Sequence, residues 1–131
     1  MLDMEKNFHI QLLKYEIKAI NFVKQKDFDN DFNSKVDPQY KVMIEKTETN
    51  EKEGLLLVTI NNDYFKLKLI SAGIFKDDKN ANIDSHTLSK VVLPLLLPFS
   101  RTVIFNTLRD AGFYNILLPT IDVQRSISSD D

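Results

Sequence analysis

Three aspartates at alternate positions are the first residues whose types and spacing could do chemistry. The run Asp27-x-Asp29-x-Asp31 resembles the opening of a calcium-binding loop. Such a loop needs glycine at its sixth position and a bidentate glutamate at its twelfth, where this chain has Phe32 and Pro38. We therefore interpret the aspartates as part of a solvated surface loop, with weak cation binding as the alternative.

Asp84, Ser85 and His86 bring together the residue types of a hydrolytic triad. Adjacent residues cannot converge as nucleophile, base and orienting acid, and the chain has no Gly-x-Ser-x-Gly turn. We interpret Asp84 or Ser85 as the N-cap of a helix instead. His9 and His86 are the only histidines, and without an acidic–histidine pair nearby they make a poor metal site.

The composition excludes several further classes of protein. The 131 residues include no cysteine and three glycines, so the chain has no thiolate site and no glycine-rich phosphate loop. Seventeen Lys and Arg against nineteen Asp and Glu give a net charge of −2, which argues against a strongly basic nucleic-acid binder. We expect no enzyme activity, no cofactor and no metal.

Length and hydropathy predict one soluble domain over residues 1–131, with 1–7 and 124–131 flexible. The longest apolar run, Val91–Phe99, contains two prolines and is too short to span a bilayer. The N-terminus lacks the basic start and the apolar stretch of a signal peptide. We therefore expect a cytoplasmic protein that does not insert into membranes.

Alternating apolar residues in the first half of the chain predict four strands, over 8–23, 40–46, 54–60 and 64–75. In the first strand the apolar parity changes after Leu12 and changes back at Ile20, which indicates a bulge. Residues 61–63, Asn-Asn-Asp, predict a hairpin turn. Gly73, near the end of the fourth strand, predicts a bend or a bulge there.

The period then changes, and apolar residues three and four apart predict one helix from Ser85 to Ala111, with Gly112 at its C′ position. Pro94 and Pro98 each delete a backbone hydrogen bond and should kink the axis. The expected fold is therefore α+β, a four-stranded antiparallel sheet packed on one long kinked helix. The apolar face of the helix is wider than one sheet needs, so we expect a second subunit to bury the remainder. A short extended segment is expected over 116–123.

Five lysines could gather on the outer face of the sheet: Lys14, Lys18, Lys41, Lys66 and Lys68. Because Glu16 and Glu45 are interspersed, a solvated face is one interpretation and a docking patch for an acidic partner is the other. Aromatic residues are not interleaved with these lysines, so nucleic-acid binding is weakly supported and we expect none.

The order and spacing of several short motifs resemble the SecB family of protein-export chaperones. Residues 8–11, Phe-His-Ile-Gln, are similar to the family's Phe-Gln-Ile-Gln, and residues 73–75, Gly-Ile-Phe, to the Gly-Gly-Ile-Phe that ends strand four. Residues 86–104 carry His-x-Leu and then Leu-x-Pro-Phe-x-Arg-x-x-Ile, which resembles the family's His-x-Leu and Leu-Phe-Pro-Tyr-Ala-Arg-x-x-Ile. Phe113 and Leu118-Pro119 resemble the segment that follows the helix, so the likeness covers about residues 8–123.

The resemblance implies a homotetramer, built as a dimer of dimers, and a non-catalytic holdase that binds unfolded polypeptide in apolar grooves without ATP. Candidate client-binding residues, which are also the expected core, are Phe22, Tyr40, Val42, Ile44, Leu56, Val58, Phe65 and Leu67. Candidates for the helix-mediated subunit interface are Leu95, Phe99, Arg101 and Val103. Arg101 could instead cap a local carboxylate. A possible partner-docking face comprises Lys14, Lys18, Lys66 and Lys68.

Two departures from the family pattern bear on function. The family's second, C-terminal helix and its translocase-binding tail have no counterpart after residue 123. The family docks the export ATPase through acidic residues on the sheet face, where this chain has Ala19, Val23, Lys66 and Lys68. These residues argue against docking to that ATPase. The alternatives to a general holdase are a dedicated chaperone for one partner, such as an antitoxin, and an adaptor subunit that has lost chaperone activity.

Overall fold

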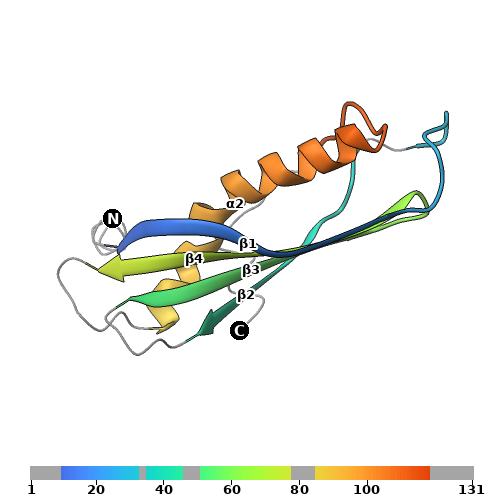
Figure 1. Ribbon diagram of the computed structural model, residues 1–131. Helices are drawn as coiled ribbons and strands as arrows, with labels where there is room; N and C mark the ends of the chain where they lie inside the picture. The colour runs from blue at the N-terminus through green and yellow to red at the C-terminus, as the bar shows by residue number, and fades with distance from the viewer. Residues whose placement is uncertain (1–9, 33–34, 46–50, 78–84, 119–131) are drawn as a thin grey trace.

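The computed structural model describes residues 10–32, 35–45, 51–77 and 85–118, and the expectations for residues 1–9, 78–84 and 119–131 lie outside it. The elements in chain order are β1 (Ile10–Lys24), β2 (Gln39–Glu45), β3 (Lys52–Asn61), β4 (Phe65–Asp77) and α2 (Ser85–Asp110). These form a four-stranded antiparallel sheet with one long helix across one face (Figure 1), which confirms the predicted α+β fold.

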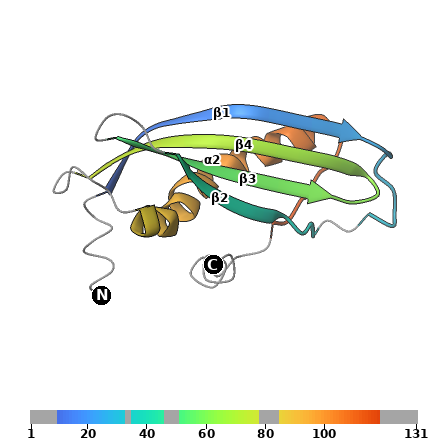
Figure 2. The same ribbon diagram turned by 90° about the horizontal axis from the view of Figure 1, so that it is seen from below.

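The strands are ordered β1-β4-β3-β2, so β3 and β4 are central and β1 and β2 are the edges. Figure 2 shows the four strands side by side with α2 behind them. The helix-facing side chains of the two central strands are almost completely buried, with Leu56, Val58, Phe65 and Leu69 at 0% exposure. The core therefore lies between α2 and the middle of the sheet.

Two bulges interrupt the pairing of β1 with β4, between Leu12 and Lys14 and between Ile17 and Ala19. These are the places where the apolar parity of the sequence changes, so the predicted bulge is confirmed and is in fact double. Each bulge returns the apolar side chains of β1 to the helix side, where Phe22 pairs with Leu67.

Of the bend or bulge predicted at Gly73, the bulge is wrong, because β4 pairs with β3 without interruption from Lys66 to Phe75. Glycine is needed there for a different reason. A Cβ on Gly73 would stand 2.7 Å from a methyl carbon of Leu96, and one on Gly54 would stand 2.5 Å from a methyl carbon of Val92. The two glycines pair with each other across β3 and β4. Because neither glycine has a side chain, α2 can pack closely against the sheet at this point.

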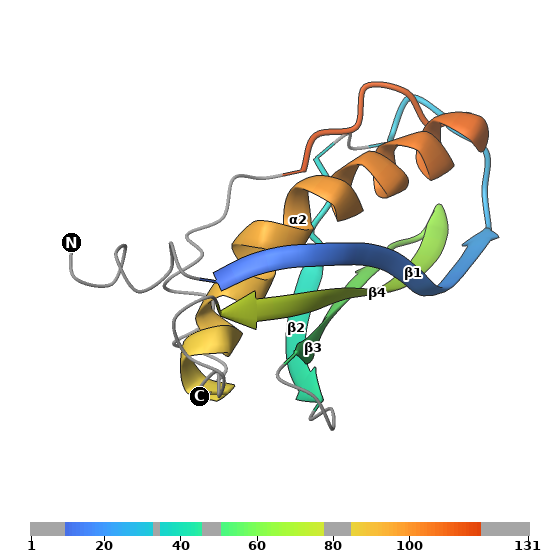
Figure 3. The same cartoon turned by 60° about the vertical axis from the view of Figure 1, so that its left-hand side comes forward.

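The long helix is continuous through Pro94 and Pro98, and its axis bends between the first turns and the remainder (Figure 3). Its C-terminus has the predicted glycine cap. Gly112 adopts a φ of 95°, its N–H donates to the carbonyl of Arg109, and the N–H of Phe113 donates to the carbonyl of Leu108 at 2.8 Å. This pair of bonds is the Schellman arrangement, which satisfies two carbonyls that would otherwise end the helix unpaired.

By length and composition alone, the helix Ser85–Asp110 could cross a membrane. The apolar run Val91–Phe99 is only nine residues long, but the apolar character of the helix continues on both sides of it. The sequence therefore underestimated the length of the apolar segment. In the fold, the helix packs on the sheet through residues such as Leu88, Leu96 and Ile104, all at 0% exposure. That packing is typical of the core helix of a globular domain.

A small polar network lies inside the apolar core beneath the helix. The hydroxyl oxygens of Ser71 on β4 and Ser100 on α2 are 3.1 Å apart, and both side chains are fully buried. The hydroxyl of Tyr15 on β1 reaches the same Ser100 oxygen at 3.3 Å. Because each buried hydroxyl has a partner, the network avoids the desolvation penalty and fixes the lateral position of α2.

We expect Gly54→Ala to destabilise the fold by about 1–3 kcal/mol, because the added methyl collides with Val92 and overpacks the core. Urea unfolding followed by circular dichroism measures the free energy. Val92→Ala removes the colliding methyl groups, so Gly54→Ala should cost much less when introduced into a Val92→Ala background. An equal cost in both backgrounds would show that the helix does not approach the sheet at Gly54.

Candidate polypeptide-binding surface

The helix is narrower than the sheet, so apolar side chains of both edge strands remain partly exposed beside it. We name these two surfaces the β1 flank and the β2 flank. The β1 flank consists of Tyr15, Ile17, Ile20, Leu95, Phe99 and Val103. The β2 flank consists of Tyr40, Val42, Ile44, Arg101 and Phe105.

On the β1 flank, Ile17 and Ile20 are each 45% exposed although they pair with Ser71 and Leu69, whose side chains lie under the helix. The ring of Tyr15 stacks on that of Phe99, with centroids 4.9 Å apart. Phe99 itself is 48% exposed. This flank therefore combines exposed apolar side chains of the edge strand with an exposed aromatic side chain of the helix.

On the β2 flank, Tyr40 and Val42 pair with Val58 and Leu56, so their side chains share the helix-facing side of the sheet. They pack against the core but are only partly buried, as is Ile44 two residues further on. Alternate residues of a strand lie about 6.6 Å apart on one face, which is the spacing of alternate side chains in any extended segment laid beside it. The flank thus offers a row of apolar contacts to an extended chain.

Arg101 borders the β2 flank, where its guanidinium lies 5.9 Å from the ring centroid of Phe105 and donates to the carbonyl of Leu118 at 3.4 Å. Among the described residues these contacts include no carboxylate, and the role of Arg101 at a subunit interface stays a prediction. Burial raises the pKa of Tyr40, and the positive charge of Arg101 acts on the same hydroxyl in the opposite direction. Arg101 therefore gives the β2 flank its positive charge.

The structure divides the eight candidate client-binding residues into two groups. Four of them are 0–1% exposed in the core beneath the helix and present no surface in this chain: Leu56, Val58, Phe65 and Leu67. The other four are partly exposed at the sheet edges: Phe22, Tyr40, Val42 and Ile44. Of the four interface candidates, Leu95, Phe99 and Val103 recur every fourth residue along one side of α2, and Arg101 lies on the other side.

The four lysines of the possible docking face do not gather into one patch. Lys14 and Lys18 form ion pairs with Glu16 at 3.4 and 2.8 Å, and Lys18 also lies 3.6 Å from Glu53. The hydrogen bond from Lys18 lowers the pKa of Glu16. Lys66 and Lys68 pair with β1 near its opposite end, roughly 20 Å along the strand from Lys14. The outer face therefore carries a mixed-charge cluster and a separate pair of exposed lysines.

The acidic loop after β1 is held in place by side-chain contacts and does not form an open cation-binding loop. Asp29 accepts a hydrogen bond from the hydroxyl of Tyr64 at 2.5 Å and pairs with Lys26 at 3.0 Å, while Asp27 pairs with Lys24 at 2.9 Å. Within the ranges that the structure covers, no three His, Asp or Glu side chains are grouped so that they could hold a metal ion.

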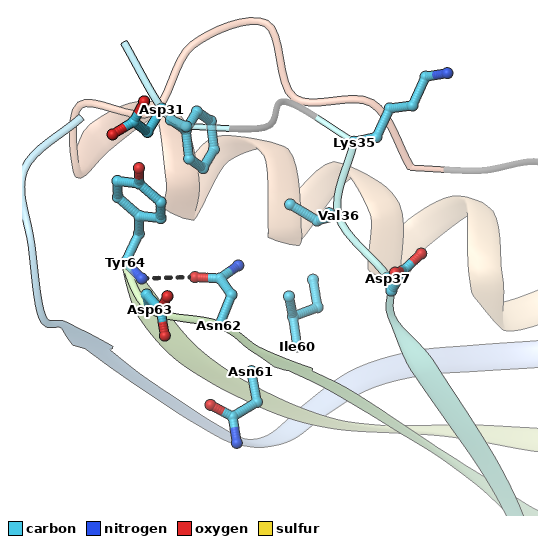
Figure 4. A pocket seen from close by; sticks show the side chains of 10 residues that line it. Asp31, Lys35, Val36, Asp37, Ile60, Asn61, Asn62, Asp63 and Tyr64 are labelled. Carbon is cyan, nitrogen blue, oxygen red and sulfur yellow. Dashed lines mark hydrogen bonds between the residues drawn. The ribbon is translucent and has the colours of Figure 1, made fainter. Parts of the chain in front are cut away.

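The ring of Phe32 also anchors the acidic loop to the core, where it contacts the rings of Tyr64 and Phe113 at centroid distances of 4.9 and 5.3 Å. A hollow of about 210 Å³ lies between the loop and the β3–β4 turn (Figure 4). In that turn, the side-chain oxygen of Asn62 accepts the backbone N–H of Tyr64 at 2.9 Å. The predicted hairpin turn is thus confirmed and is held by its asparagine.

Sequence reasoning missed Tyr15, Ile17 and Ile20 as surface residues. The parity pattern placed them on the apolar side of the first strand, and it could not show that this strand lies at an edge of the sheet. Only the strand order reveals that β1 is an edge strand, with β4 as its one neighbour among the strands that the structure describes.

Comparison with solved structures gives a close match in fold. The Mycobacterium tuberculosis Rv1957 SecB-like chaperone, solved in complex with a ChAD peptide from the Rv1956 HigA1 antitoxin, superposes with a TM-score of 0.74. The match covers 92% of this chain and 96% of that chain, at 8% sequence identity. No family model and no curated protein matches the sequence. The chain therefore has the SecB-like fold.

The hydrogen bond from the Tyr64 hydroxyl to Asp29 makes the stability of the fold depend on pH in a defined direction. The hydrogen bond from Tyr64 holds the pKa of Asp29 below its ordinary value of 3.8, and the same bond raises the pKa of Tyr64 from 10.0 to about 12. The carboxylate's contribution to stability is therefore present above pH 3.8 and is lost as the pH falls through the lowered value. The contribution of the hydroxyl is present below pH 10 and is lost as the pH rises toward 12.

We expect Tyr64→Phe to unfold at lower urea concentration than the wild type at pH 7, and the difference to be smaller at pH 3, because the contribution of the Asp29 carboxylate declines below pH 3.8. Unfolding curves at the two pH values measure the difference. Tyr114→Phe is the control, since Tyr114 is 60% exposed, and it should match the wild type at both values. A difference that is as large at pH 3 as at pH 7 would mean that the carboxylate is not the source of the stability.

Proposed function

We propose that this chain, with the fold of a SecB-like chaperone, is an ATP-independent holdase that binds unfolded polypeptide in the cytoplasm. The observation that carries the proposal is the apolar surface on both flanks of α2, exposed on the β1 flank and partly exposed on the β2 flank. Large apolar patches on soluble proteins mark surfaces that another chain covers. The structural neighbour holds a peptide, so polypeptide is a class of ligand that this fold accommodates.

The β2 flank suits an extended client. Its three apolar side chains at alternate positions match the side-chain repeat of a client strand. In the described part of the chain no strand lies along the outer edge of β2, so its backbone groups can pair with a client strand there. Such binding depends on spacing and backbone rather than on a particular client sequence, as a holdase requires. No catalytic group is needed for it, and we infer that the protein is not an enzyme.

The β1 flank suits a second copy of this chain, in keeping with a homotetramer built as a dimer of dimers. The outward side chains of β1 alternate in charge over Lys14, Glu16 and Lys18. Antiparallel pairing of two β1 strands about a two-fold axis at Tyr15 or Ile17 sets Glu16 of one copy opposite a lysine of the other. The same pairing would cover the exposed isoleucines, which an edge strand otherwise leaves to solvent.

A dedicated chaperone for one partner is the second candidate, and the antitoxin peptide in the neighbouring structure is the observation that favours it. A general holdase protects several unrelated unfolded proteins, whereas a dedicated one protects only its partner. An adaptor subunit would protect none. Since Ala19, Val23, Lys66 and Lys68 replace acidic residues on the outer face, we do not expect the export ATPase to bind.

We expect the protein to suppress the light scattering of a chemically unfolded client diluted from denaturant, at near-stoichiometric ratio and without ATP. Ile44→Ser should weaken this protection several-fold because it removes one of the three apolar contacts of the β2 flank. Met43→Ser is the matched control, since Met43 is the adjacent residue and points to the opposite face of the strand.

Both variants should keep the circular dichroism spectrum of the wild type. Protection of several unrelated clients would support the general holdase, and protection of one partner alone would support the dedicated chaperone. The absence of protection for every client, with the fold intact, would contradict both and favour the adaptor. Equal losses from Ile44→Ser and Met43→Ser would show that the client does not use the β2 flank.

We expect Phe99→Asp to dissociate the tetramer, because an unpaired carboxylate buried in an apolar interface costs on the order of several kcal/mol. Sedimentation velocity measures the assembly. Phe28→Asp is the control, since Phe28 is an equally exposed phenylalanine, at 51% against 48%, in the loop after β1. If Phe99→Asp sediments like the wild type, the β1 flank is not the subunit interface.

A further inference from the structure

The positive charge of the β2 flank lies at one end of its apolar row. Arg101 is close enough to Tyr40 for its charge to act on the tyrosine hydroxyl. Ile44, at the other end of the row, is four residues from Tyr40, which corresponds to about 13 Å along an extended strand. The flank is therefore electrostatically asymmetric along the direction of β2.

The guanidinium of Arg101 has hydrogen-bonding capacity that the fold leaves unused. It carries five N–H donors. Within the described residues, its one hydrogen bond is to the carbonyl of Leu118, and at 3.4 Å that bond is long. The contact with the ring of Phe105, at 5.9 Å from the centroid, positions the group without using a donor. No carboxylate in the described part of the chain forms an ion pair with Arg101.

The opposite side of β2 carries the same sign of charge near the same end. A hollow of about 370 Å³ lies there, lined by Gln39, Tyr40, Lys41, Val42, Leu57 and Thr59. Among these described residues the only charged one is Lys41, which pairs with Leu57 across the sheet. An extended segment beside β2 places alternate side chains on the two sides, so near Tyr40 it meets a positive charge on either side.

The carboxylates that precede and end β2 lie away from this point. Asp37, two residues before the strand, lines the other hollow, near the β3–β4 turn (Figure 4). Glu45 is the last residue of β2 and pairs with Glu53, at the opposite end from Tyr40. A carboxylate supplied by a client therefore complements the Tyr40 end of the flank, whereas a client ammonium group is repelled there.

We propose that the β2 flank selects extended client segments in which an acidic residue stands at one end of a row of alternating apolar residues, with its carboxylate bound by the guanidinium of Arg101. This selectivity rests on the proposed function, because it names the client segments that the flank holds. A planar guanidinium can bind a carboxylate through two parallel N–H···O bonds. The apolar row then supplies contact area, and Arg101 determines which segments are preferred.

Fluorescence anisotropy with short labelled peptides tests the selectivity. The peptides alternate valine and serine over the length of β2, and the terminal valine is replaced by Asp or by Asn. Because a client strand can run in either direction, the replacement is made at each end in turn. For one of the two ends, we expect the Asp peptide to bind the wild type about fivefold more tightly than the Asn peptide, as for a partly solvated ion pair. High salt should reduce this preference.

Arg101→Gln should remove the preference for Asp while leaving the affinity for the Asn peptide nearly unchanged. Arg101→Lys keeps the charge but not the planar fork, so it should retain part of the preference. Lys76→Gln is the matched control. It removes one positive charge from an exposed residue of β4 that pairs with Gln11, at the far end of the sheet, and should keep the full preference.

Equal binding of the Asp and Asn peptides by the wild type, at both ends, would overturn the selectivity and leave the proposed function standing. A preference that persists in Arg101→Gln, or that Lys76→Gln removes equally, would overturn the role of Arg101. If the wild type binds none of the peptides, the proposed function itself fails, and the selectivity fails with it.

Discussion

The structure depends on a mismatch of width between one helix and a four-stranded sheet. A helix with its side chains is about 10–12 Å across, while the edge strands of four lie roughly 14 Å apart between their axes. α2 can therefore fully cover only the central strands, where Leu56, Val58 and Phe65 are fully buried. The edge strands keep their helix-facing apolar side chains in partial contact with solvent, and both flanks follow from this geometry.

The depth at which the helix sits is set by two glycines and a pair of serines. Gly54 and Gly73 remove the side chains that would hold α2 away from the sheet, and their nearest neighbours are Val92 and Leu96. One turn further along, Ser100 meets Ser71 in a buried hydrogen bond. The close approach makes the core dense, and the polar contact favours one lateral position, so the flanks keep a constant shape.

The two edges of the sheet offer different chemistry. β1 is long and bulged, with exposed isoleucines on one side and alternating charges on the other, which suits pairing with a copy of itself. β2 is short and borders a hollow and the positive charge of Arg101, which suits a variable extended segment. In the proposed holdase, β1 pairs with a copy of the chain and β2 pairs with an extended client.

Local patterns in the sequence determined the elements of this protein. The parity changes in β1 predicted its bulges, the three-and-four spacing predicted α2, and Gly112 predicted the helix end, because each depends on neighbours within a few residues. Strand order, by contrast, depends on pairing between residues far apart in the chain, which periodicity does not encode. Only the tertiary structure decided that Leu56 and Val58 are core while Tyr40 and Ile20 are surface, although all four carry the same apolar signal. It also separated Lys14 from Lys66 and turned Asp29 toward Tyr64, because side chains acquire partners only when the sheet brings them together.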